Sequence, residues 1–169
     1  MSISVCTIVE GDLTRFKCDV IIHQSNTVLR RSHKSAGLAK ALFKRYPYCN
    51  IYKQPSTQAS AIPGEIVIRR PFRGSTGPTI IAINGQDSLG RSKTEAERNK
   101  RFGWFKEGLE KVTRYLSSSE IQRKSLITIA IPYNIGCGLA GGHWPVYFEH
   151  IQRWSQSLPS NCLVKIVRL

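Results

Sequence analysis

Apolar segments rich in β-branched residues recur along the chain and alternate with helical patterns. Several are nearly continuous apolar runs, as expected for strands that are covered on both faces of a sheet. The predicted strands are Ser4–Val9, Asp19–His23, Glu65–Ile68, Thr79–Ile83, Leu126–Ile131 and Leu163–Val167. Strands that alternate with helices predict an α/β fold, a three-layer α/β/α sandwich with a central mixed, largely parallel sheet.

Proline bounds two of the predicted helices. The first covers Ala36–Tyr46 and stops before Pro47, which cannot continue a helix. The last begins near Pro145, because the missing N–H of proline costs nothing in a first helical turn. Its buried residues are predicted to be Phe148, Ile151 and Trp154.

The helix predicted over Thr94–Leu116 carries the clearest pattern. Thr94 and Glu97 have the spacing of a capping box, in which a hydroxyl and a carboxylate satisfy free amides at the helix start. Apolar residues then repeat at alternating spacings of three and four. This stripe consists of Phe102, Phe105, Leu109, Val112 and Leu116. We expect it to face the core rather than a cofactor.

Length and composition describe one globular domain over residues 1–169. Hydrophobic residues make up 41% of the chain, and no linker or repeat divides it. The N-terminus lacks the pattern of a secretory signal, and no apolar run reaches the roughly 20 residues of a membrane-spanning helix. We therefore expect a soluble monomer in the cytoplasm or nucleus, without membrane partners.

The chain has five cysteines, at positions 6, 18, 49, 137 and 162. Their odd number and the lack of a C-x-x-C pair argue against a disulfide framework and against a structural zinc site. The sequence therefore predicts no metal and no cofactor.

Charge is the unusual feature of the composition, because 25 lysines and arginines against 11 acidic residues leave a net charge of +14. Such an excess favours polyanionic partners: nucleic acid, a phosphate-rich ligand or an anionic surface. The charge does not distinguish among them, and it also suits a simple role in solubility. Basic residues are spread from Arg15 to Arg168 rather than gathered in a tail.

Two loops that follow predicted strands have a specialised composition. In parallel α/β sheets, ligands bind beyond the carboxyl ends of the strands, where such loops lie. The first loop runs from Gln24-Ser25-Asn26 to Ala36-Gly37-Leu38 and enters a helix, whose free amides and positive dipole suit a phosphate. Small residues before a helix are also typical of an ordinary turn and cap.

The second loop covers residues 132–144 and has four glycines within seven residues, Gly136, Gly138, Gly141 and Gly142. Glycines let a backbone turn tightly, and successive amides in such a turn can bind an anion. The loop lacks the G-K-[ST] of a P-loop and the later acidic residue of a dinucleotide-binding fingerprint. Together the two loops suggest a diphosphate held between them.

These loops resemble those of the macrodomain family, which implies binding of ADP-ribose. Gly11-Asp12-Leu13-Thr14 is similar to the motif whose aspartate recognises the adenine amino group. Asn26 resembles the asparagine near the distal ribose, and Ser35-Ala36-Gly37 falls where the family has a turn at the diphosphate. The second loop resembles the other phosphate loop over Gly136, Cys137, Gly138, Leu139, Ala140 and Gly141. The resemblance extends from Ile8 to Val167.

Two further segments resemble one branch of this family. Ile83-Asn84-Gly85-Gln86-Asp87 is similar to a polar segment after a middle strand, so Gln86 is a candidate for the distal pocket. Gly142-His143-Trp144 also fits this branch. His143 could act on protons near neutral pH, or it could be a surface residue before the helix.

The sequence departs from the family in two places. The first loop is longer than usual and crowds Arg30, Arg31, His33 and Lys34 before the turn. One hydrolase branch releases ADP-ribose from acidic side chains with a lysine and an aspartate, whose positions fall approximately at Arg70 and at Ala140. Because arginine is effectively always protonated, it cannot form the same amine adduct, and this covalent route is not expected.

Each candidate residue also has an ordinary structural explanation. Asp12 could accept hydrogen bonds from the adenine amine, or it could cap a turn. Asn26 could orient the distal ribose and a water, or it could form an Asx-turn. His23 is predicted to be a satisfied core residue. Cys137 has no base next to it in sequence and is interpreted as a small tolerated residue.

The first functional hypothesis is hydrolysis of an ADP-ribose derivative, either removal of mono-ADP-ribose from protein or nucleic acid or dephosphorylation of ADP-ribose 1″-phosphate. Asn26 and a ligand phosphate would hold the attacking water, and His143 is the second catalytic candidate. The alternatives are a reader that binds ADP-ribose without turnover and a basic module that binds nucleic acid non-specifically.

Overall fold

The computed structural model describes residues 6–28, 35–53, 61–118 and 120–169. Its strands form a six-stranded sheet in the order β1-β6-β5-β2-β4-β3. The strands are β1 Cys6–Glu10, β2 Val20–Asn26, β3 Ile66–Arg69, β4 Thr79–Gln86, β5 Ile127–Pro132 and β6 Cys162–Arg168. Every neighbouring pair is parallel except β3 and β4, so the predicted mixed, largely parallel sheet is confirmed.

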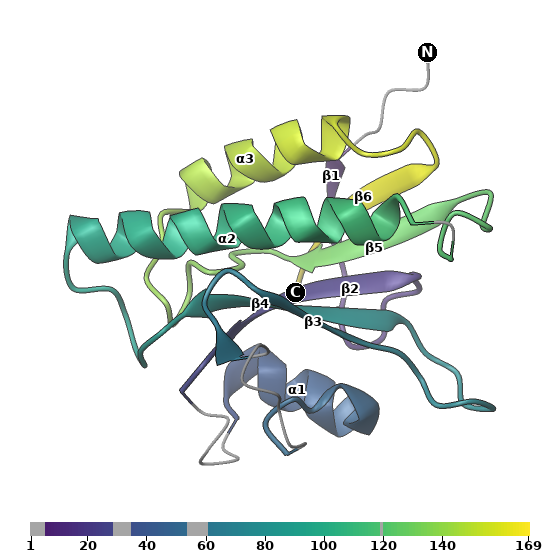
Figure 1. Cartoon of the computed structure of the whole chain (residues 1–169), viewed down its shortest axis with the longest axis horizontal. Coiled ribbons are helices and arrows are strands. Elements are labelled where there is room, and N and C mark those ends of the chain that lie inside the picture. Colours follow the sequence, from purple (N-terminus) through teal and green to yellow (C-terminus); the bar gives the residue numbers. More distant parts are fainter. Residues whose placement is uncertain (1–5, 29–34, 54–60, 119) are drawn as a thin grey trace.

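Helices cover both faces of this sheet (Figure 1). They are α1 Gly37–Arg45, α2 Glu95–Leu116 and α3 Trp144–Gln156, and a short 3₁₀ helix, η1, covers Pro47–Cys49. α2 and α3 lie on one face and α1 lies on the other, which is the predicted three-layer arrangement.

Two apolar cores fill the space between the layers, because successive strand residues point to opposite faces. In β4, Ile81 and Ile83 belong to the core that includes residues of α2 and α3, whereas Ile80 and Ala82 belong to the core that includes residues of α1. The predicted stripe of α2 is fully buried at Phe105, Leu109, Val112 and Leu116, and Phe102 packs at the edge. Burying each such side chain contributes about 1.5–3 kcal/mol, so the sheet is a firm support for the loops that leave it.

The predicted start of α2 is present, with one difference in its cap. Thr94 Oγ1 accepts a hydrogen bond from the backbone N–H of Glu97 at 3.1 Å. The Glu97 carboxylate accepts from the amide of Lys93, at 2.6 Å, instead of from that of Thr94. In α3, Pro145 stands in the first turn, as predicted.

Two strands run three residues further than their apolar patterns predict. β2 ends at Asn26 and β4 at Gln86, whereas the apolar runs end at His23 and Ile83. The additional residues are held by polar contacts across the pair: Gln24 Nε2 donates to Gln86 Oε1 at 3.2 Å. The strand ends were missed because hydrogen-bonded polar side chains replace apolar ones there.

His23 is buried as predicted, but the prediction that it is satisfied is wrong. The side chain is 1% exposed, and neither ring nitrogen has a hydrogen-bond partner among the described residues. The ring packs edge-on against Phe43, with 6.1 Å between centroids. Burial lowers the pKa of His23 from its usual 6.5 to about 4, so the imidazole is neutral at neutral pH.

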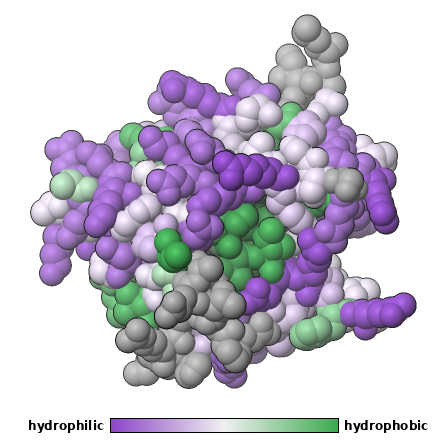
Figure 2. All heavy atoms as spheres, in the orientation of Figure 1, coloured by the Kyte–Doolittle hydropathy of each residue, from purple (hydrophilic) through white to green (hydrophobic). Residues whose placement is uncertain are grey.

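The carboxyl ends of β2, β4 and β5 meet at one edge of the sheet, on the left of Figure 1. The first predicted loop leaves β2 at this edge, and the second leaves β5 there. Hydrophilic side chains cover much of the face of the molecule seen in Figure 2. Within the described ranges, no helix is both long enough and apolar enough to cross a membrane.

Candidate functional site

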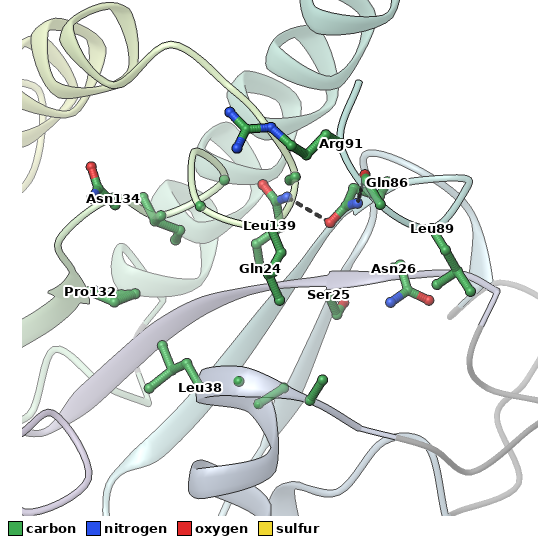
Figure 3. A pocket seen from close by; sticks show the side chains of 18 of the residues that line it. Gln24, Ser25, Asn26, Leu38, Gln86, Leu89, Arg91, Pro132, Asn134 and Leu139 are labelled. Atoms are coloured by element: carbon green, nitrogen blue, oxygen red, sulfur yellow. Dashed lines mark hydrogen bonds between the residues drawn. The ribbon is translucent and has the colours of Figure 1, made fainter. Parts of the chain in front are cut away.

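A cavity of about 680 Å³ opens where β2, β4 and β5 end (Figure 3). Its walls are residues 24–26, the start of α1 at 36–39, residues 86 and 89–91 after β4, and residues 132–136 and 138–140 after β5, together with Tyr52. We call it the first cavity. Its volume is in the range of sites that bind small molecules and cofactors.

The start of α1 supplies backbone donors to the first cavity. Its N-cap residue, Ala36, makes no side-chain cap hydrogen bond, and the first turn has no acidic residue. The amides of Gly37, Leu38 and Ala39 form no hydrogen bond with the described residues. The positive end of the helix dipole adds to these donors, so this wall suits an anion.

The glycine loop after β5 is a compact series of turns. Cys137 N donates to Asn134 O at 2.9 Å. Gly142 N donates to Gly136 O at 3.0 Å. Gly136 has a φ of +70°, and a Cβ built there would lie 2.7 Å from Gln24 Oε1, so only glycine fits this close approach.

This loop supplies a second set of backbone donors. The residues of this loop that line the cavity and whose amides form no hydrogen bond with the described residues are Asn134, Gly136, Gly138, Leu139 and Ala140. The carbonyl of Ala140 is used, because it accepts from Arg101 Nη1 at 2.9 Å and from Ser92 N at 3.0 Å. These contacts hold the loop while its amides stay available, which is the arrangement of an anion-binding nest.

The two donor-bearing walls lie close together. A Cβ built on Gly37 would come within van der Waals distance of Leu139 Cδ1, at 3.7 Å. Leu139 is 73% exposed, and the view into the cavity shows the glycine loop and the start of α1 on opposite sides of the end of β2 (Figure 3). The two loops therefore come together as the sequence predicts.

A third wall, residues 89–91, was not predicted from the sequence. Arg91 is the only charged side chain among the described residues that line the first cavity. Its guanidinium forms no ion pair or hydrogen bond with the described residues. The cavity wall therefore contributes one free positive charge and no carboxylate.

Arg101, in α2, joins this third wall to the glycine loop. Its guanidinium is buried, with the residue 4% exposed, and donates to Gly90 O at 2.8 Å, to Ala140 O at 2.9 Å and to Ser88 Oγ at 3.0 Å. Its spacing of four from Phe105 places it on the apolar stripe of α2. A charged residue on an apolar stripe was the signal that could have identified it.

Two glutamines form the floor between β2 and β4. Gln24 Nε2 donates to Gln86 Oε1, and the pair lies below the glycine loop (Figure 3). Gln24 Oε1 is buried and has no hydrogen-bond partner among the described residues. A buried acceptor without a partner is costly, so this oxygen marks a place for a ligand hydroxyl or a water.

Asn26 lines the cavity, with its side chain held locally. Its Oδ1 accepts from the amide of Val28 at 3.1 Å, which is the Asx-turn considered from the sequence. Its Nδ2 lies 3.3 Å from the hydroxyl of Tyr52, a buried residue that sequence reasoning missed. The turn orients the amide at the mouth of the cavity.

Solved structures share this architecture, although no family model and no curated protein matches the sequence. The macrodomain of Thermus aquaticus DarG matches with a TM-score of 0.69 and 17% identity, over 96% of this chain and 97% of that chain. The macrodomain of Mycobacterium tuberculosis DarG matches with a TM-score of 0.68 and 17% identity, over 97% of both chains. The chain has the macrodomain fold. A further match is Thermosipho africanus DarTG in complex with ADP-ribose, with a TM-score of 0.64 and 16% identity, over 96% of this chain and 41% of that chain.

The resemblance to macrodomains is therefore confirmed for the fold. Eight of the predicted site residues line the first cavity: Asn26, Ala36, Gly37, Gln86, Gly136, Gly138, Leu139 and Ala140. Their roles toward a ligand stay predictions, as does the longer first loop with Arg30, Arg31, His33 and Lys34, which lies outside the described residues.

Six predicted site residues do not line the first cavity: Asp12, Leu13, Ser35, Cys137, Gly141 and His143. Leu13 is buried in the core on the α1 side, so packing accounts for it. Burial raises the pKa of the Cys137 thiol to about 12, which does not suit a nucleophile. His143 is the exposed N-cap residue of α3.

Asp12 forms a turn of its own after β1. Its Oδ1 accepts from the amide of Thr14 at 2.9 Å and from its hydroxyl at 2.7 Å. These two hydrogen bonds lower the pKa of Asp12. Asp12 therefore caps a turn, which is the ordinary structural role considered from the sequence. Its contact with adenine stays a prediction.

The approximate match of Arg70 to a catalytic lysine is wrong. β3 is antiparallel to β4, so Arg70, which follows β3, lies at the opposite edge of the sheet from the first cavity. There it is paired with Glu120 at 2.6 Å. Within the described residues, no group of three or more histidine, cysteine or acidic side chains is placed to hold a metal.

Proposed function

We propose that this macrodomain binds ADP-ribose in the first cavity and hydrolyses an ADP-ribose derivative at the distal ribose. One observation carries the proposal: two groups of unpaired backbone amides, from the start of α1 and from the glycine loop, line one cavity that has no carboxylate among its described lining residues. Such donors suit the adjacent negative charges of a diphosphate.

Two further features support a nucleotide rather than a free phosphate. The cavity volume of about 680 Å³ exceeds the need of a single anion. Tyr133 also lines it and provides an aromatic face near the loop after β5. Thermosipho africanus DarTG, which shares the fold, has been solved in complex with ADP-ribose.

Hydrolysis in this cavity would rest on positioning. The described lining residues include no histidine, lysine, cysteine or carboxylate, and their only ordinary acid–base groups are the phenols of Tyr52 and Tyr133. Asn26 and a phosphate oxygen of the bound ligand would hold a water against the anomeric carbon. The water oxygen forms the new bond to this carbon, the bond to the leaving group breaks, and the leaving group takes up the proton.

Calorimetric titration with ADP-ribose tests the binding step. Gly138→Glu should abolish binding, because a Cβ at Gly138 meets no atom within 4 Å and the longer side chain can fill the cavity without disturbing the fold. Gly103→Glu is the matched control, since the space around Gly103 is equally open and it lies in α2. We expect the wild type and Gly103→Glu to bind ADP-ribose with micromolar affinity and Gly138→Glu not to bind it. No binding by the folded wild type would refute the proposal.

Turnover is tested separately, by incubating the protein with ADP-ribosylated protein, ADP-ribosylated nucleic acid and ADP-ribose 1″-phosphate. Release of ADP-ribose or phosphate, slowed in Asn26→Ala with little change in binding, is expected. The lack of histidine, lysine, cysteine and carboxylate side chains among the described lining residues favours one alternative, a reader. Binding without product from any of these substrates would establish that alternative.

A further inference from the structure

A second cavity, of about 810 Å³, lies at the opposite edge of the sheet, on the right of Figure 1. It is lined by residues 15–19 after β1, by Tyr46, by residues 70–71 after β3, by residues 76–79 before β4, and by Tyr115, Glu120, Ile121 and Lys124 around the end of α2. A seven-residue strand such as β2 separates the two edges by about 20 Å. The second cavity is therefore distinct from the first.

The side chains of this second cavity are strongly basic. Its lining cations are Arg15, Lys17, Arg70 and Lys124. Its two carboxylates are already neutralised, Asp19 by Lys124 at 2.5 Å and Glu120 by Arg70 at 2.6 Å. The positive charge of the remaining cations is left without compensation from the wall.

Two more cations lie in chain segments that lining residues bound in sequence, and we call these segments the rim. Arg73 lies between Pro71 and Thr76, and Arg123 lies between Ile121 and Lys124. Arg73, Arg123 and Lys17 are exposed and form no hydrogen bond or ion pair with the described residues. Counting the rim, six cations surround the cavity against two carboxylates, which leaves four positive charges in excess.

An exposed aromatic ring stands beside these cations. Phe72 is 70% exposed and precedes Arg73 in the turn between β3 and β4. The turn is ordered by Ser75, whose amide and hydroxyl donate to Phe72 O at 2.8 Å and 2.6 Å. An exposed ring on an ordered turn, followed in sequence by a free cation, is suited to stack an unpaired base beside its phosphate.

We infer that this basic surface, made of the second cavity, its rim and the Phe72 turn, binds single-stranded nucleic acid. Unpaired bases offer faces to the Phe72 ring, whereas a duplex keeps its bases stacked inside. A single ring does not provide the apolar face that inserts into a membrane. The first cavity, with Arg91 as its one described charge, lacks the cations to follow a phosphate backbone.

The test is fluorescence anisotropy with labelled single-stranded DNA and RNA of about 16 nucleotides, a length within the range that such surfaces cover. Lys17→Glu/Arg73→Glu should weaken binding at least about tenfold and lower the slope of log affinity against log salt by about 1.4. Both side chains are exposed and without contacts to described residues, so the variant keeps its fold.

The matched control is Lys93→Glu/Arg98→Glu, which makes the same charge change at the other end of α2, about 30 Å away. We expect this pair to change affinity less than about twofold. Equal losses in the two double variants would show diffuse attraction by the net charge and overturn the inference. A larger loss of affinity in the control would place the nucleic acid near the first cavity and would also overturn the inference.

Phe72→Ala isolates the stacking contribution and should weaken single-strand binding about fivefold or more, with no effect on a duplex of the same sequence. Excess ADP-ribose should not displace the oligonucleotide, and Gly138→Glu should bind it normally. Displacement by ADP-ribose, an unchanged affinity of Phe72→Ala, or no binding at low salt would each refute a nucleic-acid surface at this edge. None of these outcomes depends on whether ADP-ribose binds the first cavity.

Discussion

The two cavities occupy opposite edges of one sheet and present positive charge in different ways. The first offers backbone amides and one charged side chain, Arg91. The second is bordered by lysine and arginine side chains that outnumber its carboxylates. Amides act at hydrogen-bond distance and in a fixed direction, whereas full charges act over about 10 Å in ordinary salt. The difference teaches that the net charge of +14 says little about the first cavity, whose donors are mainly peptide groups.

The largest effect is expected from Arg101→Met, which should break the first cavity alone. Gly90 O and Ala140 O would lose a charged donor, so the free energy of unfolding should fall by about 3 kcal/mol. ADP-ribose affinity should fall about a hundredfold or more because the glycine loop and the 89–91 wall separate. Denaturant unfolding and calorimetry measure both, with Arg98→Met, exposed on the same helix, as the control. An equal loss of oligonucleotide binding would contradict the separation of the two sites.

Lowering the pH should destabilise the sheet that supports both cavities, and so reduce ligand binding to both. The pKa of His23 is about 4 in the folded protein against its usual 6.5, so the unfolded chain binds a proton more readily. The free energy of unfolding therefore has its full value above pH 6.5. It falls by about 3 kcal/mol as the pH drops from 6.5 toward 4.

Denaturant unfolding over this pH range should show the loss in the wild type and a flatter profile in His23→Leu. His143→Leu removes an exposed histidine instead and should leave the profile unchanged. A profile that is the same in the wild type and in His23→Leu would mean that His23 is not the group that titrates.

Salt should change the affinities of the two cavities for their ligands more differently than any substitution of an exposed residue. Raising salt from about 50 to 200 mM should lower single-strand affinity about fiftyfold if four phosphates are contacted. ADP-ribose affinity should change only a few-fold, because its main partners are amides at short range. Parallel titrations by anisotropy and calorimetry check this difference. Similar salt slopes for the two ligands would mean that both rely on side-chain charge.

A smaller effect is expected from Arg91→Ala, which removes the one described charge of the first cavity. ADP-ribose affinity should fall about tenfold, as for the loss of one charge-assisted contact. Arg91→Lys should recover most of it, and Arg98→Ala should have no effect. Calorimetry provides the measurement. An unchanged affinity of Arg91→Ala would mean that Arg91 does not contribute and that the backbone amides alone bind the anion.

Periodicity of apolar residues was enough to predict the layers, since each predicted strand and helix is present within a few residues. The strand ends at Asn26 and Gln86 were missed because polar side chains continue the pairing there. The glycine loop was found because its glycine density is a local signal, and the positive φ of Gly136 shows why glycine is needed.

Residues that reach the first cavity from elsewhere in the chain had no such local signal. Tyr52 and Arg91 line it only because of the path of the backbone between distant elements. The unsatisfied state of His23 also depends on its neighbours, which periodicity does not describe. For the same reason the second cavity, built from several separate segments, could not be predicted even though Arg69-Arg70-Pro71-Phe72-Arg73 is plain in the sequence.

The peptide donors of the first cavity have a consequence for divergence. A site made of main-chain amides depends on where glycines and helix starts fall, and most side chains around it are free to change. The chain accordingly has the fold of a macrodomain with which it shares only 17% of its residues. A comparison of shape finds this likeness where a comparison of sequence finds none.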